Sequence, residues 1–194
     1  MKLRLDSGRP DLQIGEATRR GMAEFATGVA LAATFQGDHI QAVTVNSFAC
    51  QSLRPPIVSI SLREDLRILK TIVESQVFSV SIMPIESHVL ADELGRPRLG
   101  QVRGFEAGSK WGRRSGLPHL KSALAWFACE LDQLVQIGDH VLVLATPTEV
   151  RTSRDRLWRA GPSEGSNADS PLVFHRRSYT TVEPWQLGSE PTSR

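Results

Sequence analysis

The residue types that most often act in catalysis, such as cysteine, histidine and serine, form few recognisable spacings in this sequence. The two cysteines, Cys50 and Cys129, form no C-x-x-C pair, and none of the five histidines forms an H-x-x-x-H pair with another. Zinc sites and disulfide frameworks depend on such spacings, so the sequence predicts no metal site and no disulfide framework. The serine-hydrolase pattern G-x-S-x-G occurs at 161–165, but a polar segment precedes it and no apolar helix follows. That pattern works only on a sharp turn from strand to helix, so we interpret it as a loop.

The stretch best suited to hold a ligand is Val43–Pro56, with the sequence VTVNSFACQSLRPP. It begins with the alternation of a β-strand, becomes small and polar, and ends in two prolines, which a central strand does not tolerate. One interpretation is a surface loop in which Asn46 and Ser47 are turn residues. The other is a backbone segment whose N–H and C=O groups are open to the polar edge of a flat ligand. Phe48 is the only bulky residue between Asn46 and Ser52, which favours the second interpretation.

The elements that must position this stretch are mostly strands. The sequence predicts helices over 11–26, 65–75 and 84–95, and Asp65 is placed to cap the second of them. Apolar residues alternate with serine over 77–83, which predicts a half-buried strand, whereas 96–123 is interpreted as irregular. Further strands are expected at 29–35, 40–45, 57–62, 125–135 and 140–150, with a last short hairpin within 171–183.

Short turns between strands, together with few helices, favour a mainly β fold: a β-barrel with a few short helices. The 194 residues fit one domain at 11–185, between a flexible N-terminus at 1–10 and a tail at 186–194. A net charge of +2 creates no strong field for nucleic acid, and the longest apolar runs are too short to span a membrane. No secretory signal is recognisable, so we expect a cytoplasmic protein.

Four segments, in order and with their spacing kept, resemble one known family. They are FATGVALAATFQGDHIQAVTVNSFACQSLRPPIVSISL, RGFEAGSKWGRRSGLPHL, ALAWFACELDQLVQIGDHVLVLATPTEV and PLVFHRRSYTTV. Together they are similar to the flavin reductase domain, whose fold is the FMN-binding split barrel, over roughly residues 15–185.

The resemblance implies a homodimeric NAD(P)H-dependent flavin reductase. Such a protein transfers a hydride from NADH or NADPH to FMN or FAD and supplies the reduced flavin to a partner monooxygenase. Two alternatives stay open. One is a flavin-binding split barrel without reductase turnover, and the other is a flavoenzyme that holds FMN tightly and acts directly on a small substrate.

The resemblance also implies roles for particular residues. His140 would lie near the flavin and position the nicotinamide, although it could instead be a strand-start residue that bonds a backbone carbonyl. The segment REDLRI at 63–68 departs from the family, because Glu64 and Asp65 would repel a flavin phosphate; this predicts weak binding of flavin as a substrate. The residues implied to bind flavin are Thr44, Val45, Asn46, Ser47, Ala49, Cys50, Ser61, Arg63 and Arg67, and those implied to border the nicotinamide are Arg103, Phe105 and His140.

Overall fold

The computed structural model describes residues 12–95, 101–102, 110–153, 155 and 170–182. Most of the described residues lie in β-strands and three α-helices accompany them, so the prediction of a mainly β fold is confirmed. The predicted N-terminus at 1–10, the tail at 186–194, the loop at 161–165, Arg103 and Phe105 lie outside the described residues.

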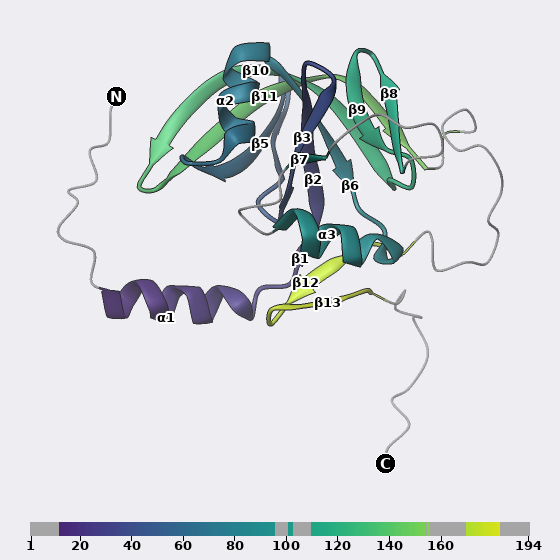
Figure 1. Ribbon diagram of the computed structural model, residues 1–194. Helices are drawn as coiled ribbons and strands as arrows, with labels where there is room; N and C mark the ends of the chain where they lie inside the picture. The colour runs from purple at the N-terminus through teal and green to yellow at the C-terminus, as the bar shows by residue number, and fades with distance from the viewer. Residues whose placement is uncertain (1–11, 96–100, 103–109, 154, 156–169, 183–194) are drawn as a thin grey trace.

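An eight-stranded antiparallel sheet forms the body of the protein (Figure 1). Its strand order is β4-β5-β11-β10-β6-β2-β3-β7, so strands that are distant in sequence become neighbours. The sheet curls, and β3 comes close to β5, although these two strands are not paired. The strands are β2 (Ala30–Gln36), β3 (His39–Val45), β4 (Ala49–Leu53), β5 (Pro56–Arg63), β6 (Val77–Ile82), β7 (Gln101–Val102), β10 (Ala125–Ile137) and β11 (His140–Thr152).

Smaller elements cover the sheet. The helices are α1 (Leu12–Ala23), α2 (Arg67–Ser75) and α3 (His88–Gly95), and a 3-10 turn at Ile85–Ser87 leads into α3. The strands β8 (Trp111–Arg114) and β9 (Leu117–Leu120) form a hairpin, and β1 (Thr27–Gly28), β12 (Val173–His175) and β13 (Ser178–Thr180) form a small separate sheet.

The helix α2 closes the inside of the curled sheet. Its buried residues Ile68, Leu69 and Ile72 pack in one core cluster with strand residues such as Ile60 and Val143. Val73 of the same helix is 42% exposed and lies outside this buried stripe. A second cluster on the other face of β2 and β3 lies beneath α3, so β2 is buried on both faces, which explains its unbroken apolar sequence.

The strand β6 is more buried than its alternating sequence predicts. Ser79 and Ser81 are both buried, so the prediction of a half-buried strand is wrong. Their hydroxyls are satisfied by the β8–β9 hairpin: Ser79 Oγ donates to the Pro118 carbonyl at 2.5 Å, and the Leu120 amide donates to Ser81 Oγ at 3.2 Å. A serine can be buried at little cost when its hydroxyl has such partners.

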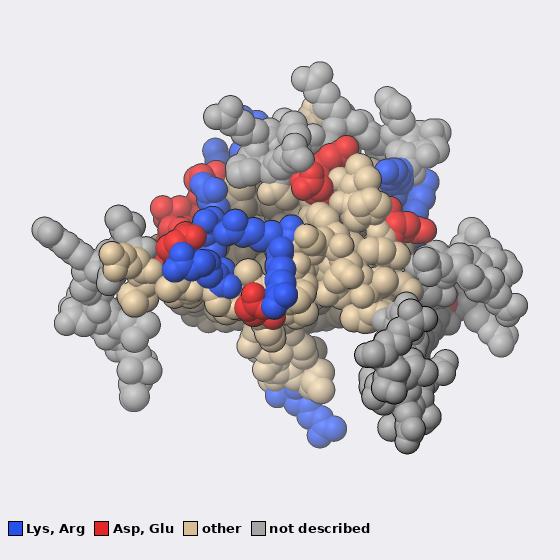
Figure 2. Space-filling model, turned by 90° about the horizontal axis from the view of Figure 1, so that it is seen from below, with Lys and Arg blue, Asp and Glu red and all other residues tan. Residues whose placement is uncertain are grey.

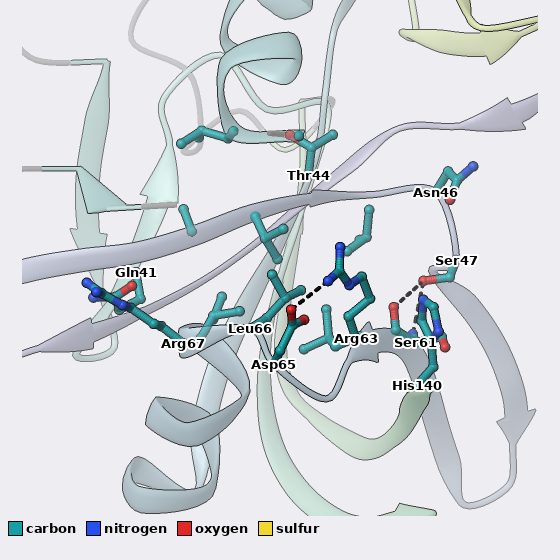
Figure 3. Close-up of a pocket in the computed structure, with 17 residues that line it drawn as sticks. Gln41, Thr44, Asn46, Ser47, Ser61, Arg63, Asp65, Leu66, Arg67 and His140 are labelled. Atoms are coloured by element: carbon teal, nitrogen blue, oxygen red, sulfur yellow. Dashed lines mark hydrogen bonds and ion pairs between the residues drawn. The ribbon is translucent and has the colours of Figure 1, made fainter. Parts of the chain in front are cut away.

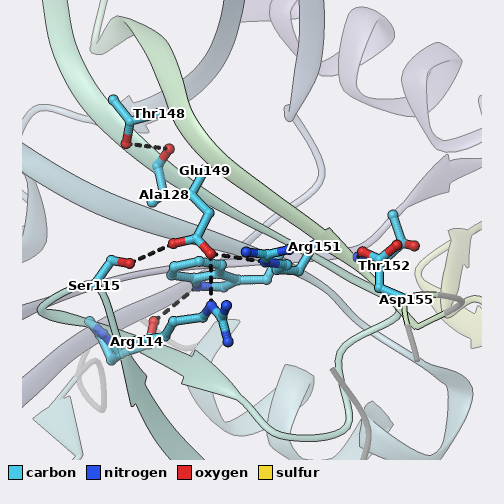
Figure 4. Close-up of polar contacts among 10 residues, drawn as sticks. Arg114, Ser115, Ala128, Thr148, Glu149, Arg151, Thr152 and Asp155 are labelled. Atoms are coloured by element: carbon cyan, nitrogen blue, oxygen red, sulfur yellow. Dashed lines mark hydrogen bonds and ion pairs between the residues drawn. The ribbon is translucent and has the colours of Figure 1, made fainter. Parts of the chain in front are cut away.

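A carboxylate fixes the turn of this hairpin to β11 (Figure 4). Glu149 accepts hydrogen bonds from Ser115 Oγ at 2.5 Å, Arg114 Nε at 2.8 Å and Arg151 Nε at 2.9 Å. These bonds lower the pKa of Glu149 to about 2, so the carboxylate remains charged at neutral pH. The hairpin is therefore held by ionic contacts at its turn and by buried hydroxyls along its length.

Within the hairpin, Gly112 leaves the space that the His119 ring occupies. The two residues are cross-strand partners, and a Cβ added to Gly112 would lie 2.2 Å from His119 Cε1. We expect Gly112→Ala to reduce the free energy of unfolding by about 1–3 kcal/mol, because the half-buried ring must move. The thermal unfolding midpoint measures this loss. Gly28→Ala is the control, since its Cβ would meet nothing within 4 Å, and an equal loss in both variants would contradict the steric explanation.

His119 also makes stability depend on pH. Burial, helped by the charges of Arg114 and Lys121, lowers its pKa to about 4. The unfolded chain, with an ordinary histidine pKa of about 6.5, binds the proton more readily, so this contribution is complete above that pH and is lost on acidification towards pH 4. Urea unfolding across this range should show a smaller loss for His119→Gln than for the parent protein. Parallel pH dependences would show that His119 does not contribute.

Candidate functional site

A cleft of about 680 Å³ opens between the curled sheet and two helices (Figure 3). Its walls come from the second half of β3 and the residues just after it, the end of β5, the start of α2, the end of α3, and His140 at the start of β11. The cleft thus forms where β3 and β5 approach without pairing. Its volume is within the range of about 300–1,000 Å³ that is usual for small-molecule sites.

Most of the residues singled out in the sequence meet in this cleft. Ala49 and Cys50 do not line it: they lie in β4, paired with Ser59 and Val58 of β5. The structure thus corrects the interpretation of 46–52 as one open segment, because only its first residues border the cleft and the rest form an edge strand. The singled-out residues that do line it are Thr44, Val45, Asn46, Ser47, Ser61, Arg63, Arg67 and His140.

Two hydroxyls fix the cleft wall. Ser47 Oγ accepts a hydrogen bond from the Ser61 amide at 2.9 Å and lies 3.2 Å from the Ser61 carbonyl oxygen, to which it donates. Thr44 Oγ1 donates to the Ala91 carbonyl of α3 at 2.9 Å. The first contact joins the exit of β3 to β5, and the second holds α3 over β3. These serine and threonine side chains therefore set the shape of the cleft.

Of the charged residues at the end of β5 and just after it, some line the cleft and one does not. Arg63 Nη2 lies 2.5 Å from Asp65 Oδ2, and both residues line the cleft. Asp65 was predicted to cap α2, and this is wrong: Leu66 occupies the N-cap position without a side-chain cap. Glu64 does not line the cleft and accepts a hydrogen bond from Gln136 Nε2 at 3.1 Å. Figure 3 shows Arg67 on the side of Gln41, away from His140.

His140 is oriented by its neighbour in sequence. Its Nδ1 lies 2.8 Å from Asp139 Oδ1, and this hydrogen bond lowers the pKa of Asp139. An ionised carboxylate only accepts hydrogen bonds, so Nδ1 carries the proton and, in the neutral ring, Nε2 is an acceptor. The partner of the His140 ring is therefore the Asp139 carboxylate, and not the backbone carbonyl that the sequence analysis considered.

Some cleft residues were not found from the sequence. Leu94 and Gly95 reach the cleft because α3 packs across β3, a contact between segments about 50 residues apart. Gln41, Ala42 and Asp65 were also missed as cleft residues. The neighbouring Thr44 was found because it belongs to the quoted stretch. No periodicity distinguishes a cleft residue from a core residue on the same strand.

The donors of the cleft suit a flat ligand that carries a negative group. Arg63 and Arg67 can attract an anion, and exposed backbone and the Asn46 amide can meet a polar ring edge. The half-buried apolar side chains of Val43 and Leu66 offer surface to a planar ring. The fold and the cleft together define a mainly β barrel whose cleft has the size of a small-molecule site and is lined by two arginines.

The chain belongs to the flavin reductase like domain family, whose model matches residues 22–183. It is 32% identical over 162 residues to the NADH-dependent flavin reductase StyB of Pseudomonas fluorescens, covering 83% of this chain and 86% of that protein. It is 29% identical over 165 residues to the reductase component of 4-hydroxyphenylacetate 3-monooxygenase of Thermus thermophilus, covering 84% and 94%.

A solved structure shares the fold. The styrene monooxygenase flavin reductase of Pseudomonas putida S12 aligns with a TM-score of 0.69 and 29% identity, covering 87% of this chain and 99% of that chain. The predicted split-barrel fold is thereby confirmed. Among the described helices, none has the length and apolar character needed to cross a membrane.

Proposed function

We propose that this protein is an NADH- or NADPH-dependent flavin reductase that reduces FMN or FAD for a partner monooxygenase. The observation that carries the proposal is the convergence of eight implied flavin- and nicotinamide-binding residues on one cleft. Family membership and the names of the relatives, which are NADH-dependent flavin reductases and monooxygenase components, support the same activity. We place the protein in the cytoplasm, where NADH and a monooxygenase would be available.

The residues of the cleft have separate tasks in this reaction. The flavin supplies the electron-accepting chemistry when it is bound. The segment 44–47 would hold the polar edge of its ring, and Arg63 and Arg67 would attract its phosphate. His140, oriented by Asp139, would position the nicotinamide, since hydride transfer requires the two rings at near-attack distance. This cleft needs no proton-transfer triad, which agrees with the lack of such a constellation in the sequence.

The decisive experiment follows NADH and NADPH oxidation by the purified, desalted protein, without flavin and then with riboflavin, FMN or FAD. We expect a colourless protein whose NADH oxidation depends on added flavin. A yellow protein that oxidises NADH without added flavin would instead identify a tightly bound flavoenzyme. Absence of oxidation with every flavin and either nicotinamide would contradict the reductase and favour a flavin-binding protein.

The helix α1 is the part of the structure that bears on the oligomeric state of the proposed enzyme. The helix projects from the body in Figure 1. Its apolar residues Ile14 and Met22, together with Phe25 just after the helix, are 58–64% exposed. A lone helix of this length is marginal in water. Figure 2 shows acidic and basic side chains mixed on this side, in keeping with the Arg19–Glu16 and Arg176–Glu24 pairs.

We therefore propose a homodimer in which the partner covers α1. Light scattering coupled to size-exclusion chromatography should give twice the chain mass. The double variant Ile14→Glu, Phe25→Glu should shift this mass towards that of the monomer, and the exposed control Val89→Glu should not. A monomeric parent protein would contradict the proposal.

A further inference from the structure

Asp65 places a negative charge in the cleft, where the proposed function needs to attract the negatively charged phosphate of a flavin. Its carboxylate lies 2.5 Å from Arg63 Nη2, and both side chains are about half exposed, at 59% and 48%. Figure 3 shows the pair between the Arg67 side of the cleft and the side that carries Ser47, Ser61 and His140. A ligand in the cleft therefore meets the Arg63–Asp65 pair and not a lone arginine.

The pair weakens the cleft as an anion site in two ways. An arginine already engaged by a carboxylate must give up or share that contact before it can bind a phosphate in the paired, two-bond geometry that makes such contacts strong. The carboxylate also repels the phosphate directly over a few ångströms. Arg67 has no ion pair with the described residues, so it is the cleft cation whose charge is not offset.

The adjacent acid provides an internal comparison. Glu64 carries the same charge one residue earlier, but its carboxylate is bonded to Gln136 Nε2 at 3.1 Å and it does not line the cleft. Any effect of overall charge near the cleft would be shared by Glu64 and Asp65. An effect on phosphate binding that acts through Arg63 is expected only from Asp65, because Asp65 and not Glu64 is paired with Arg63.

We propose that Asp65 is a specificity-determining residue that weakens the binding of the flavin phosphate by engaging Arg63, so that flavin exchanges as a substrate. The inference rests on the proposed function, because it assumes that flavin occupies the cleft. It adds to that function the reason why this enzyme releases flavin: the contact that would anchor the phosphate is held by the protein's own carboxylate.

The test compares flavins that differ only in the phosphate. Dissociation constants of riboflavin and FMN are measured by quenching of flavin fluorescence, at one fixed ionic strength, for the parent protein, Asp65→Asn and Glu64→Gln. We expect Asp65→Asn to tighten FMN about 3- to 10-fold, and to change riboflavin less than about twofold. Glu64→Gln should change the affinity for either flavin less than about twofold, because Glu64 does not line the cleft and its carboxylate is bonded to Gln136.

Coupling to Arg63 is tested in the same assay. Arg63→Met should weaken FMN more than riboflavin, and Asp65→Asn added to Arg63→Met should tighten FMN less than it does alone. Circular dichroism of each variant confirms that it is folded. Equal tightening of both flavins, equal effects of Asp65→Asn and Glu64→Gln, or no effect of Asp65→Asn would each overturn the proposal.

These failures differ from failure of the proposed function. A parent protein that reduces flavin and binds riboflavin and FMN, but whose affinities are indifferent to Asp65, overturns the role of Asp65 and leaves the reductase intact. A parent protein that binds neither flavin overturns both.

Discussion

Replacement of His140 by alanine is expected to lower kcat/KM for NADH about 10- to 100-fold, because misplacement of a reacting ring by about 1 Å can cost two orders of magnitude. The histidine lines the cleft, and Asp139 Oδ1, at 2.8 Å from Nδ1, holds its ring in place. Steady-state oxidation of NADH with saturating FMN measures the effect. The apparent KM for FMN should change much less, since the residues proposed to bind the flavin lie on or next to β3, β5 and α2.

Two variants sharpen this result. Asp139→Asn keeps the ring but replaces the carboxylate that fixes its tautomer, so it should reproduce part of the His140→Ala loss. His39→Ala is the control, because His39 is the exposed first residue of β3 and does not line the cleft. A kcat/KM for NADH that is the same in His140→Ala as in the parent protein would show that His140 only begins a strand.

The cleft could be predicted from the sequence where one continuous stretch supplies its residues. Thr44 and Val45 end the strand β3, and Asn46 and Ser47 follow it directly, so their placement needs only the strand and its end. Ala49 and Cys50 belong to the same stretch, yet they pair with β5 at the edge of the sheet. Small residues suit an edge strand and an open loop equally well, so their types do not separate the two structures.

Asp65 shows a different limit. Aspartate before an amphipathic run is a favoured helix cap, and local preference predicted that role. In the structure, Arg63, two residues earlier, takes the carboxylate instead, and the helix begins after Leu66 without a side-chain cap. The result depends on the end of β5, which directs Arg63 into the cleft, and helix propensities contain no information about it.

The β8–β9 hairpin was interpreted as irregular although its turn carried a signal. Ser115 and Gly116 both have positive φ, 49° and 77°, as a tight two-residue hairpin turn requires, and a residue followed by glycine is typical of such turns. The flanking tetrapeptides WGRR and LPHL are short, basic and proline-containing, and this hid the strands. What fixes them is tertiary: the buried hydroxyls of β6 and the carboxylate of Glu149.

In the long β10–β11 hairpin, the buried Trp126 and the cleft residue His140 lie far apart. His140 begins β11 at the cleft, whereas Trp126, paired with Arg151, lies at the opposite end of the two strands. Eleven strand positions at about 3.3 Å each separate His140 from Arg151 along β11. Substitutions at the Trp126 end can therefore be made without touching any residue that lines the cleft, which allows the two properties to be measured separately.

Trp126→Ala is expected to reduce the free energy of unfolding by about 3–5 kcal/mol, more than any other variant considered. The indole is fully buried, lies edge-on to His119 at 6.0 Å between ring centroids, and donates from Nε1 to the Pro118 carbonyl at 3.3 Å. Its loss leaves a large cavity beneath the β8–β9 hairpin. Urea unfolding followed by circular dichroism measures the change.

Trp126→Phe separates volume from hydrogen bonding, and should cost about 0.5–1.5 kcal/mol for the lost indole hydrogen bond, because the Pro118 carbonyl keeps its bond from Ser79 Oγ and most of the ring volume remains. At a temperature where Trp126→Ala is still folded, its KM for NADH and for FMN should equal those of the parent protein. A kinetic loss as large as that of His140→Ala would mean that the hairpin controls the cleft through the length of β10 and β11. Unchanged kinetics with the stability loss would show that Trp126 serves the barrel alone.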